Sequence, residues 1–382
     1  MTSLTNATDA PLGLYLHVPF CSAICAYCNF NRGLYEESLK TRYVTAVIRE
    51  IERCGARENA DTIYFGGGTP SLLTPIEVGR MIDACRRVFQ MSDVSEVTLE
   101  INPEDAIPAR LDGYREVGVN RLSFGVQSFS DEELCRLGRN HSAAQACEAV
   151  RQARRSGFDN VSVDLMLWLA QQTVTQARES IDSLLTLRPE HASLYLLELY
   201  PNAPLREIMA RQAWSLAPDD DAVEMYLSAF DQLEAAGYER YELSNVALQG
   251  YQSRHNLKYW IDGEWLGFGC GAHSTRGGRR WHNISGTADY VDLVESGGDL
   301  VAGYRVLNVD QRVEEALFTG LRLTEGVDLK SIRQQYGVDV WRRYGDDLSS
   351  HLQAGLVSRD INRLRLTRRG TLLANEVMGV FV

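Results

Sequence analysis

Three cysteines stand within eight residues in the stretch Cys21-Ser-Ala-Ile-Cys25-Ala-Tyr27-Cys28. The spacing C-x3-C-x2-C keeps the three sulfur atoms close, because eight residues span at most ~29 Å even when fully extended. A structural zinc site takes four protein ligands, and an electron-transfer iron–sulfur cluster takes four thiolates. Three thiolates from one loop therefore predict a cluster with one iron open to a further ligand. The alternative is three buried neighbouring cysteines, which the flanking Pro19 and polar Asn29-Phe30-Asn31 disfavour.

The composition is that of an ordinary globular protein. The chain has 382 residues, of which 45% are hydrophobic and 24% charged, and no run approaches the ~20 apolar residues of a membrane span. Its net charge of −12 argues against a general nucleic-acid binder. The polar N-terminal segment is typical of neither a signal nor a transit peptide, so we expect a cytoplasmic protein whose eight cysteines are thiols or metal ligands. Five isolated cysteines are expected in the core: Cys54, Cys85, Cys135, Cys147 and Cys270.

Six strand-like runs alternate with six helical patterns over the first half of the chain. The runs are short and rich in Val, Ile, Tyr and Phe, at 14–18, 62–65, 97–101, 121–125, 161–165 and 193–199. The helical patterns lie at 36–54, 75–89, 108–116, 131–137, 143–156 and 174–187, and Thr74-Pro75 and Ser142 are helix-start signals. Six successive βα units predict an α/β fold with parallel strands curved into a full or partial barrel.

The pattern changes after residue 202. A long amphipathic helix is expected at 219–236, and a Gly- and aromatic-rich stretch follows at 250–278. Within that stretch, Gly267-Phe-Gly-Cys-Gly-Ala-His273 is expected to form a close-packed turn. We therefore expect a flexible tail at 1–11, a barrel at 12–202, a linking helix and aromatic region at 203–305, and a smaller C-terminal domain at 306–382.

The C-terminal domain is expected to be largely helical. Helices at 311–320, 329–336 and 340–352, followed by a hairpin at 356–367, resemble a winged helix. A DNA-binding regulator with a metal sensor is therefore one alternative function. The interspersed aspartates and the net charge instead favour packing against protein for its arginines: Arg342, Arg343, Arg363, Arg365, Arg368 and Arg369.

Polar residues or glycines stand at the C-terminal ends of the first five strands. They are His17 to Cys21, Gly66-Gly67-Gly68-Thr69-Pro70, Glu100, Gln127 and Asp164. Because α/β barrels build their active sites at this end, the five segments are expected to converge. The three glycines expose backbone N–H and C=O groups, and no Lys-Ser/Thr follows to make a phosphate loop. The run suits the ends of an amino-acid moiety, with a simple turn as the alternative, and Glu100, Arg139 and Asp164 suit an ammonium, a carboxylate and ribose hydroxyls.

The cysteine loop combined with the glycine strand end resembles the radical S-adenosylmethionine (SAM) superfamily. Over nearly its whole length the chain is similar to the coproporphyrinogen III dehydrogenase-like branch, through Tyr15-Leu-His17-Val-Pro-Phe-Cys21, Gly66–Pro70, Glu100-Ile-Asn-Pro-Glu104, Ser123-Phe-Gly-Val-Gln127-Ser-Phe129 and Leu137-Gly-Arg139-Asn-His141. The resemblance implies a partial (β/α)6-type barrel, a [4Fe–4S] cluster, and SAM chelated to the fourth iron and split by an electron from the cluster. By the same resemblance, Cys21, Cys25 and Cys28 bind the cluster, and the SAM contacts are Tyr15, Gly67, Gly68, Thr69, Glu100, Gln127, Arg139 and Asp164.

Two subfamilies of that branch compete. Porphyrinogen dehydrogenases carry a fourth cysteine two residues after the third, and a long N-terminal extension, whereas here that position is Phe30 and 20 residues precede Cys21. HemW-type haem chaperones carry a His-Asn-x-x-Tyr-Trp motif, which is intact at 255–260. Alone, such a hexapeptide is typical of an ordinary helix or loop. Within this resemblance it implies His255 as the haem ligand, since a neutral imidazole ligates haem iron and Tyr and Trp offer flat faces to a porphyrin.

The resemblance thus implies a haem chaperone that binds a [4Fe–4S] cluster, SAM and haem. It implies transfer of haem to acceptor haemoproteins, among them membrane-bound respiratory enzymes, and allows a haem-linked homodimer. The alternative is an oxygen-independent coproporphyrinogen III dehydrogenase, so enzymatic activity is left open. One segment departs from the family: the usual Gly-Leu-Pro-Gly-Gln loop after strand five reads Trp168-Leu-Ala-Gln-Gln172. This loss of two glycines and a proline is expected to reshape the adjoining pocket, and it bears on SAM turnover more than on SAM binding.

Overall fold

A twelve-stranded mixed sheet forms the larger part of the molecule in a computed structural model that describes residues 10–55, 57–201 and 203–382. The strand order is β14-β13-β12-β11-β1-β4-β5-β6-β7-β8-β10-β9. Six successive strands at its centre are parallel: β1 (Leu12–Val18), β4 (Ala60–Gly67), β5 (Glu96–Ile101), β6 (Arg121–Gln127), β7 (Val161–Leu167) and β8 (His191–Leu196). The expected flexible tail at 1–11 lies outside the described residues, apart from its last two positions.

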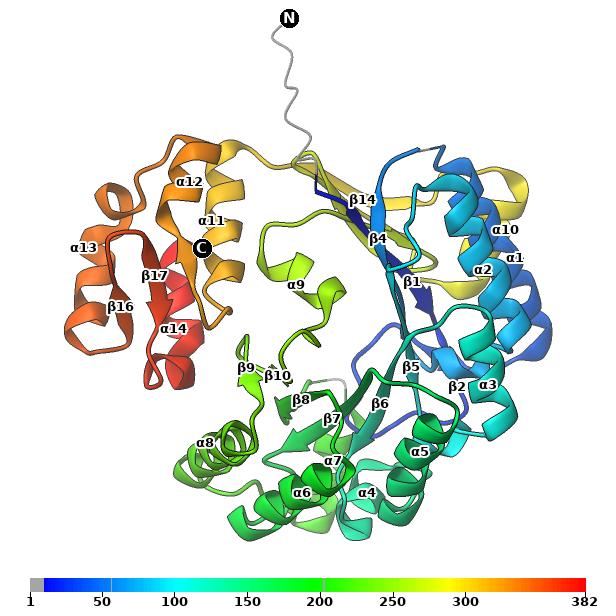
Figure 1. Ribbon diagram of the computed structural model, residues 1–382, viewed down its shortest axis with the longest axis horizontal. Helices are drawn as coiled ribbons and strands as arrows, with labels where there is room; N and C mark the ends of the chain where they lie inside the picture. Colours follow the sequence, from blue (N-terminus) through cyan, green and yellow to red (C-terminus); the bar gives the residue numbers. More distant parts are fainter. Residues whose placement is uncertain (1–9, 56, 202) are drawn as a thin grey trace, which may run out of the picture.

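The predicted βα units are confirmed, and their helices cover the convex face of the sheet (Figure 1). These helices are α1 (Glu37–Arg53), α2 (Pro75–Val88), α3 (Pro108–Glu116), α4 (Asp131–Leu137), α5 (Ala143–Arg155) and α6 (Val174–Leu187). Both predicted helix starts are complete capping boxes, Thr74 with Glu77 and Ser142 with Gln145. Single turns of 3-10 helix follow β4 at Pro70–Leu72 and β5 at Pro103–Asp105.

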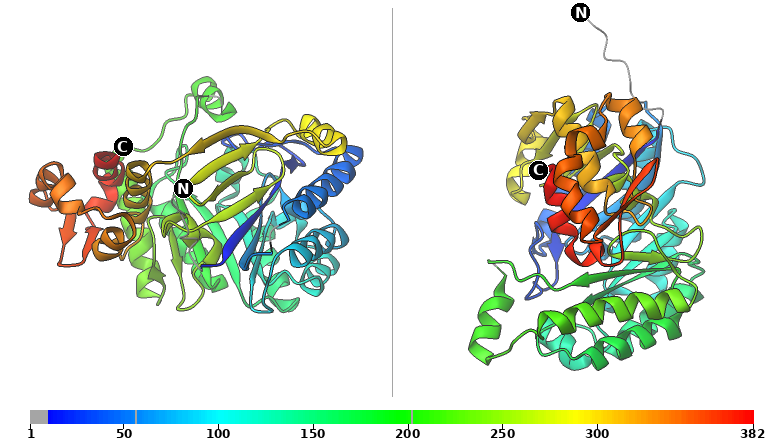
Figure 2. Two further views of the ribbon diagram at one scale, coloured as in Figure 1. Left: turned by 90° about the horizontal axis from the view of Figure 1, so that it is seen from above. Right: turned by 90° about the vertical axis from the view of Figure 1, so that its left-hand side faces the viewer.

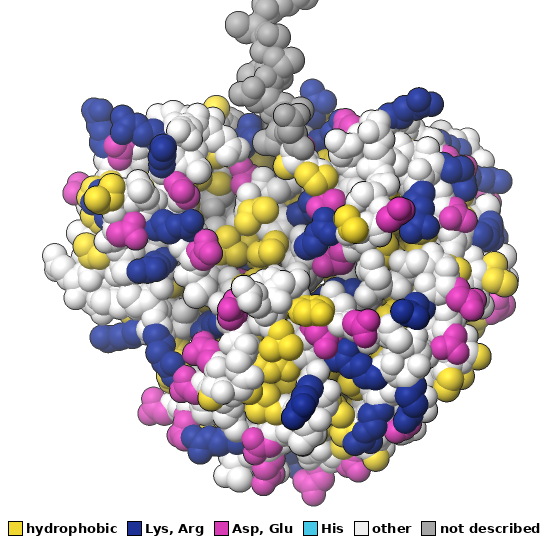
Figure 3. Space-filling model, in the orientation of Figure 1, with side chains coloured by type: hydrophobic (Ala, Val, Ile, Leu, Met, Phe, Trp, Pro, Cys, Tyr) yellow, Lys and Arg dark blue, Asp and Glu magenta, His cyan; other side chains and the backbone are white. Residues whose placement is uncertain are grey.

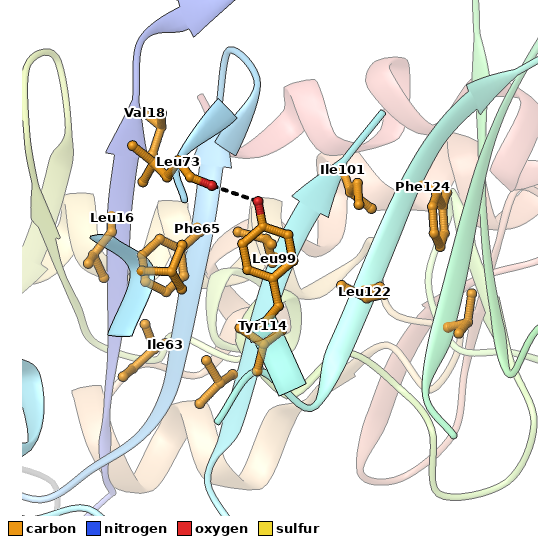
Figure 4. Close-up of a cluster of buried hydrophobic side chains, with 14 of the residues drawn as sticks. Leu16, Val18, Ile63, Phe65, Leu73, Leu99, Ile101, Tyr114, Leu122 and Phe124 are labelled. Carbon is orange, nitrogen blue, oxygen red and sulfur yellow. Dashed lines mark hydrogen bonds between the residues drawn. The ribbon is translucent and has the colours of Figure 1, made fainter. Parts of the chain in front are cut away.

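The main core lies between this sheet and its helices. Strand residues alternate in direction, so Leu16, Ile63 and Leu99 point toward the helices and are fully buried (Figure 4). The Tyr114 hydroxyl of α3 donates a hydrogen bond of 2.6 Å to the Leu73 carbonyl and so joins the helix layer to the turn after β4. The residues between them in each strand face the concave side, which is where the polar side chains gather.

Strands beyond the six predicted ones extend the sheet at both ends. β11 (Trp265–Phe268) pairs in parallel with β1, and β12 (His273–Arg276), β13 (Arg279–Asn283) and β14 (Val301–Val306) continue antiparallel. Helix α10 (Thr287–Ser296) lies between β13 and β14 in the chain. At the other end β8 is followed by β10 (Asn245–Ala247) and β9 (Glu239–Arg240). Among the described residues β9 and β14 end the sheet without pairing to each other, so the barrel is partial.

Three helices connect the barrel strands with the outer ones. They are α7 (Pro204–Gln212), α8 (Asp219–Ala235) and α9 (Arg254–Trp260). Figures 1 and 2 show α8 beside α6 on the outside, whereas α9 lies on the concave side, within the curve of the sheet. No pattern in the sequence indicated that α9 would lie inside the curve of the sheet.

A second core belongs to the C-terminal region, where the predicted helical, winged-helix-like arrangement is confirmed. Helices α11 (Val309–Gly320), α12 (Leu329–Tyr336), α13 (Val340–Gln353) and α14 (Ala374–Met378) pack beside a small sheet of β15 (Val327–Asp328), β17 (Arg363–Leu366) and β16 (Val357–Arg359). Arg343 pairs with Asp310, and Arg368 pairs with Asp231 of α8 at 2.6 Å. Figure 3 shows basic and acidic side chains interspersed over the visible face.

Three sequence expectations need correction or completion here. Of the five cysteines expected in the core, Cys85 and Cys270 are buried and Cys147 is half-buried. Cys54 and Cys135 are exposed because they stand at the end of α1 and on the outer side of α4. β7 continues to Leu167, so Asp164 lies inside the strand rather than at its end. Among the described helices, none is both long and apolar enough to cross a membrane.

Candidate cofactor site

The three cysteines occupy one loop at the C-terminal end of β1. Cys21 ends the short strand β2 (Phe20–Cys21), which pairs with β3 (Gly33–Leu34) on the far side of the loop. The Ala26 backbone N–H donates to the Leu137 carbonyl at 3.0 Å, which anchors the loop to the end of α4. Cys21 is buried, Cys25 and Cys28 are half-buried, and none of the three forms a disulfide.

Two guanidinium groups lie beside the thiols. Arg139 Nη1 donates to Cys25 Sγ at 3.3 Å, and Arg32 Nη2 donates to the Cys28 carbonyl at 2.6 Å. Burial raises the pKa of the Cys21 and Cys28 thiols, and the Arg32 charge opposes that rise. Among the described residues no three His, Cys, Asp or Glu side chains converge as they would on a single metal ion. An iron–sulfur cube needs no such convergence, because each thiolate binds a different iron, so the donor set fits a cluster.

The glycine run after β4 lies directly against the cysteine loop. The Gly68 N–H donates to the Val18 carbonyl at 2.8 Å, and the Thr69 N–H donates to the Phe20 carbonyl at 2.7 Å. A Cβ on Gly68 would stand 2.7 Å from the Phe20 carbonyl oxygen and 3.0 Å from Cys21 Sγ. Gly67 has φ +120° and a Cβ there would collide with the His17 ring, so only glycine permits this approach of strand to loop.

His17 connects β1 to the same loop. Its Nε2 donates to the Asn31 carbonyl at 2.8 Å, which leaves Nδ1 as the acceptor for the Tyr15 hydroxyl at 3.1 Å. Burial lowers the pKa of His17, so the neutral form that this arrangement needs is favoured. The predicted SAM contact Tyr15 is thus held in place by a residue that also supports the loop.

Glu100 is half-buried on the concave face of β5. It accepts hydrogen bonds from the Tyr64 hydroxyl at 2.8 Å and from the Gly67 N–H at 3.3 Å. The pKa of Glu100 is raised to about 7, chiefly by burial and also by the nearby Asp164, while the hydrogen bonds from Tyr64 and Gly67 oppose the rise. Asp164 accepts from Ser123 at 3.3 Å, and burial raises its pKa as well. Two carboxyls whose charges are poorly solvated suit a cationic or hydroxyl-rich ligand.

The remaining predicted contacts stand at the same end of the sheet. Arg139 Nη2 donates to Asn102 Oδ1 at 2.8 Å, and the Asn102 amide donates to Thr69 Oγ1 at 3.4 Å. Gln127 ends β6 beyond a register shift and has φ +71°, a left-handed conformation that is uncommon for a non-glycine residue. The structure therefore brings nine of the eleven predicted cluster and SAM residues to the C-terminal end of the sheet, while Tyr15 and Asp164 lie deeper, within β1 and β7.

Sequence reasoning missed several residues on the concave face. Tyr64 and Asn102 hold predicted residues in place, and Arg121, the first residue of β6, is 1% exposed. Arg121 Nε and Nη1 have no hydrogen-bond partner among the described residues. Its charge lowers the pKa of both Glu100 and Asp164. The only sequence signal was the alternation of polar residues with apolar ones along each strand.

The loop at 168–172, which departs from the family pattern, keeps a glycine-like backbone. Trp168 has φ +60° and Gln171 has φ +62°, at the two positions where the family usually has glycine. Trp168 Nε1 donates to the Ala217 carbonyl at 2.8 Å, and the Gln171 N–H donates to the Ser215 carbonyl at 2.9 Å. These bonds hold the two residues in a left-handed conformation that usually costs about 1 kcal/mol or more each. The expected reshaping of the adjoining pocket stays a prediction.

His255 lies at the opposite end of the barrel interior from the cysteines. Glu96, near the N-terminal end of β5, accepts from the Arg254 and His255 N–H groups at 3.0 and 3.1 Å and so fixes the start of α9. Thr62, the partner of His255 on β4, stands six positions before Gly68, or roughly 20 Å along an extended strand. The His-Asn-x-x-Tyr-Trp helix therefore closes the end of the barrel away from the cysteine loop.

His255, the residue expected to present an imidazole to haem, is a buried ring in this structure, and its role as haem ligand stays a prediction. The side chain is 0% exposed, and both ring nitrogens are in hydrogen bonds, Nδ1 with Thr62 Oγ1 at 2.8 Å and Nε2 with the Tyr259 hydroxyl at 2.9 Å. Its ring stacks on Tyr64 at 5.1 Å between centroids. Burial lowers its pKa to about 3, so the ring is neutral. Binding of iron by this ring would require one of these two hydrogen bonds to be released.

Comparison with known families agrees with the geometry. The family model of the radical SAM superfamily matches residues 15–184, and the model of the HemN C-terminal domain matches residues 307–373. Among solved structures, coproporphyrinogen III oxidase (HemN) from Escherichia coli, described as a radical SAM enzyme, superimposes with a TM-score of 0.85. That alignment covers 97% of this chain and 90% of HemN at 24% identity, which establishes the shared fold.

Relatives of higher identity extend over the full chain. The protein named Heme chaperone HemW of Bacillus subtilis is 36% identical over 372 residues, which is 96% of this chain and 98% of that protein. The protein of the same name from Mycobacterium tuberculosis H37Rv is 34% identical over 385 residues, 99% of this chain and 96% of its own length. A mouse mitochondrial protein, radical S-adenosyl methionine domain-containing protein 1, is 35% identical over 96% of this chain and 86% of its own length.

Proposed function

This chain belongs to the family of the haem chaperones named HemW, within the radical SAM superfamily, and we propose that it binds haem and passes it to acceptor haemoproteins. The observation that carries the proposal is the similarity to HemW proteins from end to end, at 31–36% identity. Two features of the chain support it. Phe30 stands where a porphyrinogen dehydrogenase keeps a cysteine, and the His-Asn-x-x-Tyr-Trp sequence is intact at 255–260.

Membership in the superfamily implies a [4Fe–4S] cluster, and we assign its ligands to Cys21, Cys25 and Cys28. The assignment is supported by three thiols on one anchored loop with Arg139 and Arg32 beside them. When bound, the cluster would supply one-electron chemistry at an iron that no protein residue ligates. A Cys25→Ala protein reconstituted with iron and sulfide should lose most of its iron, and full retention would overturn the assignment.

Membership likewise implies SAM, and we assign its contacts to residues around the cysteine loop: Tyr15, Gly67, Gly68, Thr69, Glu100, Gln127, Arg139 and Asp164. The glycine run offers backbone groups to an amino acid, while Glu100 and Asp164 accept hydrogen bonds from ammonium or hydroxyl groups. The Tyr15 hydroxyl donates a hydrogen bond to His17, and the His17 ring in turn donates to the Asn31 carbonyl of the cysteine loop. An Asp164→Asn protein should bind SAM at least tenfold more weakly in a calorimetric titration, with its iron content unchanged.

A second candidate function is favoured by one observation, the fold shared with coproporphyrinogen III oxidase at a TM-score of 0.85. Under it, the same cofactor residues would support oxidative decarboxylation of coproporphyrinogen III. Phe30, 67% exposed, argues against it, because the position lacks the thiol of the catalytic relatives.

One paired experiment separates the two functions. Reconstituted protein is titrated with haem and, in parallel, incubated with coproporphyrinogen III, SAM and a reductant. We expect a haem complex that transfers its haem to an apo-haemoprotein, and no protoporphyrinogen IX. Robust formation of protoporphyrinogen IX would overturn the chaperone function. The cytoplasmic location, the domain boundaries, the identity of the acceptor and a haem-linked dimer stay predictions.

A further inference from the structure

Arg121 is a buried guanidinium without a partner in the interior of the barrel. It is the first residue of β6 and is 1% exposed. Within the described part of the chain it forms no ion pair, and its Nε and Nη1 have no hydrogen-bond partner. A buried charge in this state lowers the stability of a protein, and it therefore points to a functional role.

Arg121 lies on the concave face of the sheet, between the two carboxyls assigned to SAM. Leu122 points toward the helices (Figure 4), so its strand neighbours Arg121 and Ser123 point the opposite way. Glu100 of β5 is opposite Ser123, and Asp164 of β7 accepts a hydrogen bond from Ser123 at 3.3 Å. The two carboxyls therefore lie on either side of β6, nearer its C-terminal end than Arg121.

Exposure distinguishes the guanidinium from the two carboxyls. Glu100 and Asp164 are half-buried, so a ligand can reach them, whereas Arg121 is almost completely covered. Burial raises the pKa of both carboxyls, and the Arg121 charge opposes that rise in each. Arg121 can thus act on a bound ligand through the two carboxyls rather than by contact.

The tyrosines and histidines that face this interior do not balance the two carboxyls. Loss of hydration raises the pKa of the tyrosines and lowers the pKa of the histidines, so both kinds of side chain are neutral near pH 7. They belong to β1, β4, β8, α9 and the segment before β10, and they are Tyr15, Tyr64, Tyr195, Tyr241, Tyr259, His17, His191 and His255.

The other charged groups near the interior already have partners. Each contacts an opposite charge, a thiol or backbone N–H groups: Lys258 with Asp61 at 2.7 Å, Glu242 with Arg322 at 3.1 Å, Arg139 with Cys25 at 3.3 Å, and Glu96 with the first N–H groups of α9. Among the described residues, Arg121 is thus the interior cation left to balance Glu100 and Asp164.

We propose that Arg121 is a positioning residue for SAM, which keeps both Glu100 and Asp164 ionised so that the site matches the charge of SAM. The sulfonium, ammonium and carboxylate of SAM sum to one positive charge, and the two carboxylates with the guanidinium sum to one negative charge. Without Arg121, two like charges would share a poorly hydrated interior, and one carboxyl would keep its proton. The inference rests on the proposed SAM contacts, because it names the residue through which two of them are held ready.

The test is the pH dependence of SAM binding, measured by calorimetric titration of the reconstituted full chain from pH 6.5 to pH 9. We expect Arg121→Met to bind SAM about tenfold more weakly than wild type at pH 6.5, because a pKa shift of about one unit changes the ionised fraction by up to tenfold. The ratio of the two affinities should approach one at pH 9, where the carboxyls of the variant ionise too. Titration of SAM itself cancels in this ratio.

Three further variants control the result. Arg121→Gln, a second neutral replacement, should behave as Arg121→Met does, whereas Arg121→Lys restores the charge and should follow the wild type. Arg154→Met is the matched control, since it removes an arginine of α5 that pairs with Glu190 at 2.7 Å on the helix side of the sheet. Iron content and circular dichroism should be unchanged in all four variants.

The outcomes that overturn the inference are distinguishable from a failure of the proposed SAM contacts. Wild type that binds SAM while Arg121→Met keeps its affinity at every pH overturns the role of Arg121 and leaves the contacts standing. A loss of affinity that is equal at every pH, or that Arg121→Lys shares, also overturns that role, because it marks structural damage. Wild type that binds no SAM overturns the contacts and the inference together.

Discussion

Thr62 and His255 stand 193 positions apart in the chain, yet 2.8 Å separates Thr62 Oγ1 from His255 Nδ1. The bond joins the barrel strand β4 to α9, and the Tyr259 hydroxyl holds the other ring nitrogen. All of this lies inside the barrel, where a polar group that loses its partner costs about 1–3 kcal/mol.

We expect His255→Ala to lower the free energy of unfolding by about 3 kcal/mol, because it leaves Thr62 and Tyr259 unpaired and opens a cavity. Thr62→Val, which removes one bond at constant size, should cost roughly 1–2 kcal/mol. Thermal unfolding of the cluster-free chain measures both, and His351→Ala is the control. An unchanged midpoint for His255→Ala would contradict the buried position of this ring.

Gly68→Ala should reduce the iron bound after reconstitution severalfold. The added methyl would stand 2.7 Å from the Phe20 carbonyl oxygen and 3.0 Å from Cys21 Sγ, so the loop must move. Gly33→Ala is the matched control, since Gly33 pairs with Phe20 in the same loop but a Cβ there meets nothing within 4 Å. Iron and sulfide analysis per chain gives the result, and equal loading of the two variants would count against the close approach of strand to loop.

Gln171→Gly should be more stable than Gln171→Ala by about 1 kcal/mol, the reverse of the usual order. Both changes remove the Gln171 side chain, so their difference isolates the cost of φ +62° for a residue with a Cβ. The control pair is at Glu179, an exposed residue within α6. There Glu179→Ala should be more stable than Glu179→Gly by about 1 kcal/mol. Thermal midpoints of the four proteins decide the matter, and alanine above glycine at 171 would refute a left-handed backbone there.

Glu50 should make stability fall as the pH rises. Burial raises its pKa from 4.5 to about 7, although Tyr290, Gly269 and Asn283 donate hydrogen bonds to it. The folded state binds the Glu50 proton more tightly than the unfolded state does. The contribution of this proton to the free energy of unfolding is therefore complete below pH 4.5 and is lost as the pH rises through about 7.

The measurement is the thermal midpoint at pH 5 and at pH 8. Wild type should lose more stability between the two than Glu50→Gln does, by on the order of 3 kcal/mol. Glu100 responds to pH in the same direction in both proteins, so the difference belongs to Glu50. Exposed Glu116→Gln should follow the wild type, and a parallel response of Glu50→Gln would contradict the raised pKa.

The barrel and the cysteine end of the site were predictable because short stretches of sequence carry the signals for both. Alternation of apolar residues marked the six strands, and Thr74 and Ser142 marked helix starts. Parallel strands place their C-terminal ends at one edge of the sheet. The residues at those ends could therefore be predicted to lie near the cysteine loop.

The outer strands and the position of His255 were not predictable in this way. β11 and β12 are only four residues long and separated by a glycine-rich turn, so no alternation emerges. The burial of His255 depends on Thr62, which lies far away in the chain and carries no motif. A motif names a residue type at a spacing, whereas its availability to a ligand is decided by tertiary partners.

One strand, β4, contacts both α9 and the cysteine loop. Thr62 hydrogen-bonds His255 of α9, and Gly68, just past the strand, lies against Cys21. A ligand that shifts α9 must therefore be accommodated by the backbone that cradles the cysteine loop. Thermodynamic reciprocity then requires that if cluster loading alters haem affinity by some factor, haem alters cluster retention by the same factor. In that case a haem affinity has meaning only together with the cluster occupancy at which it was measured. One binding constant then cannot describe both the cluster-free and the cluster-loaded chain.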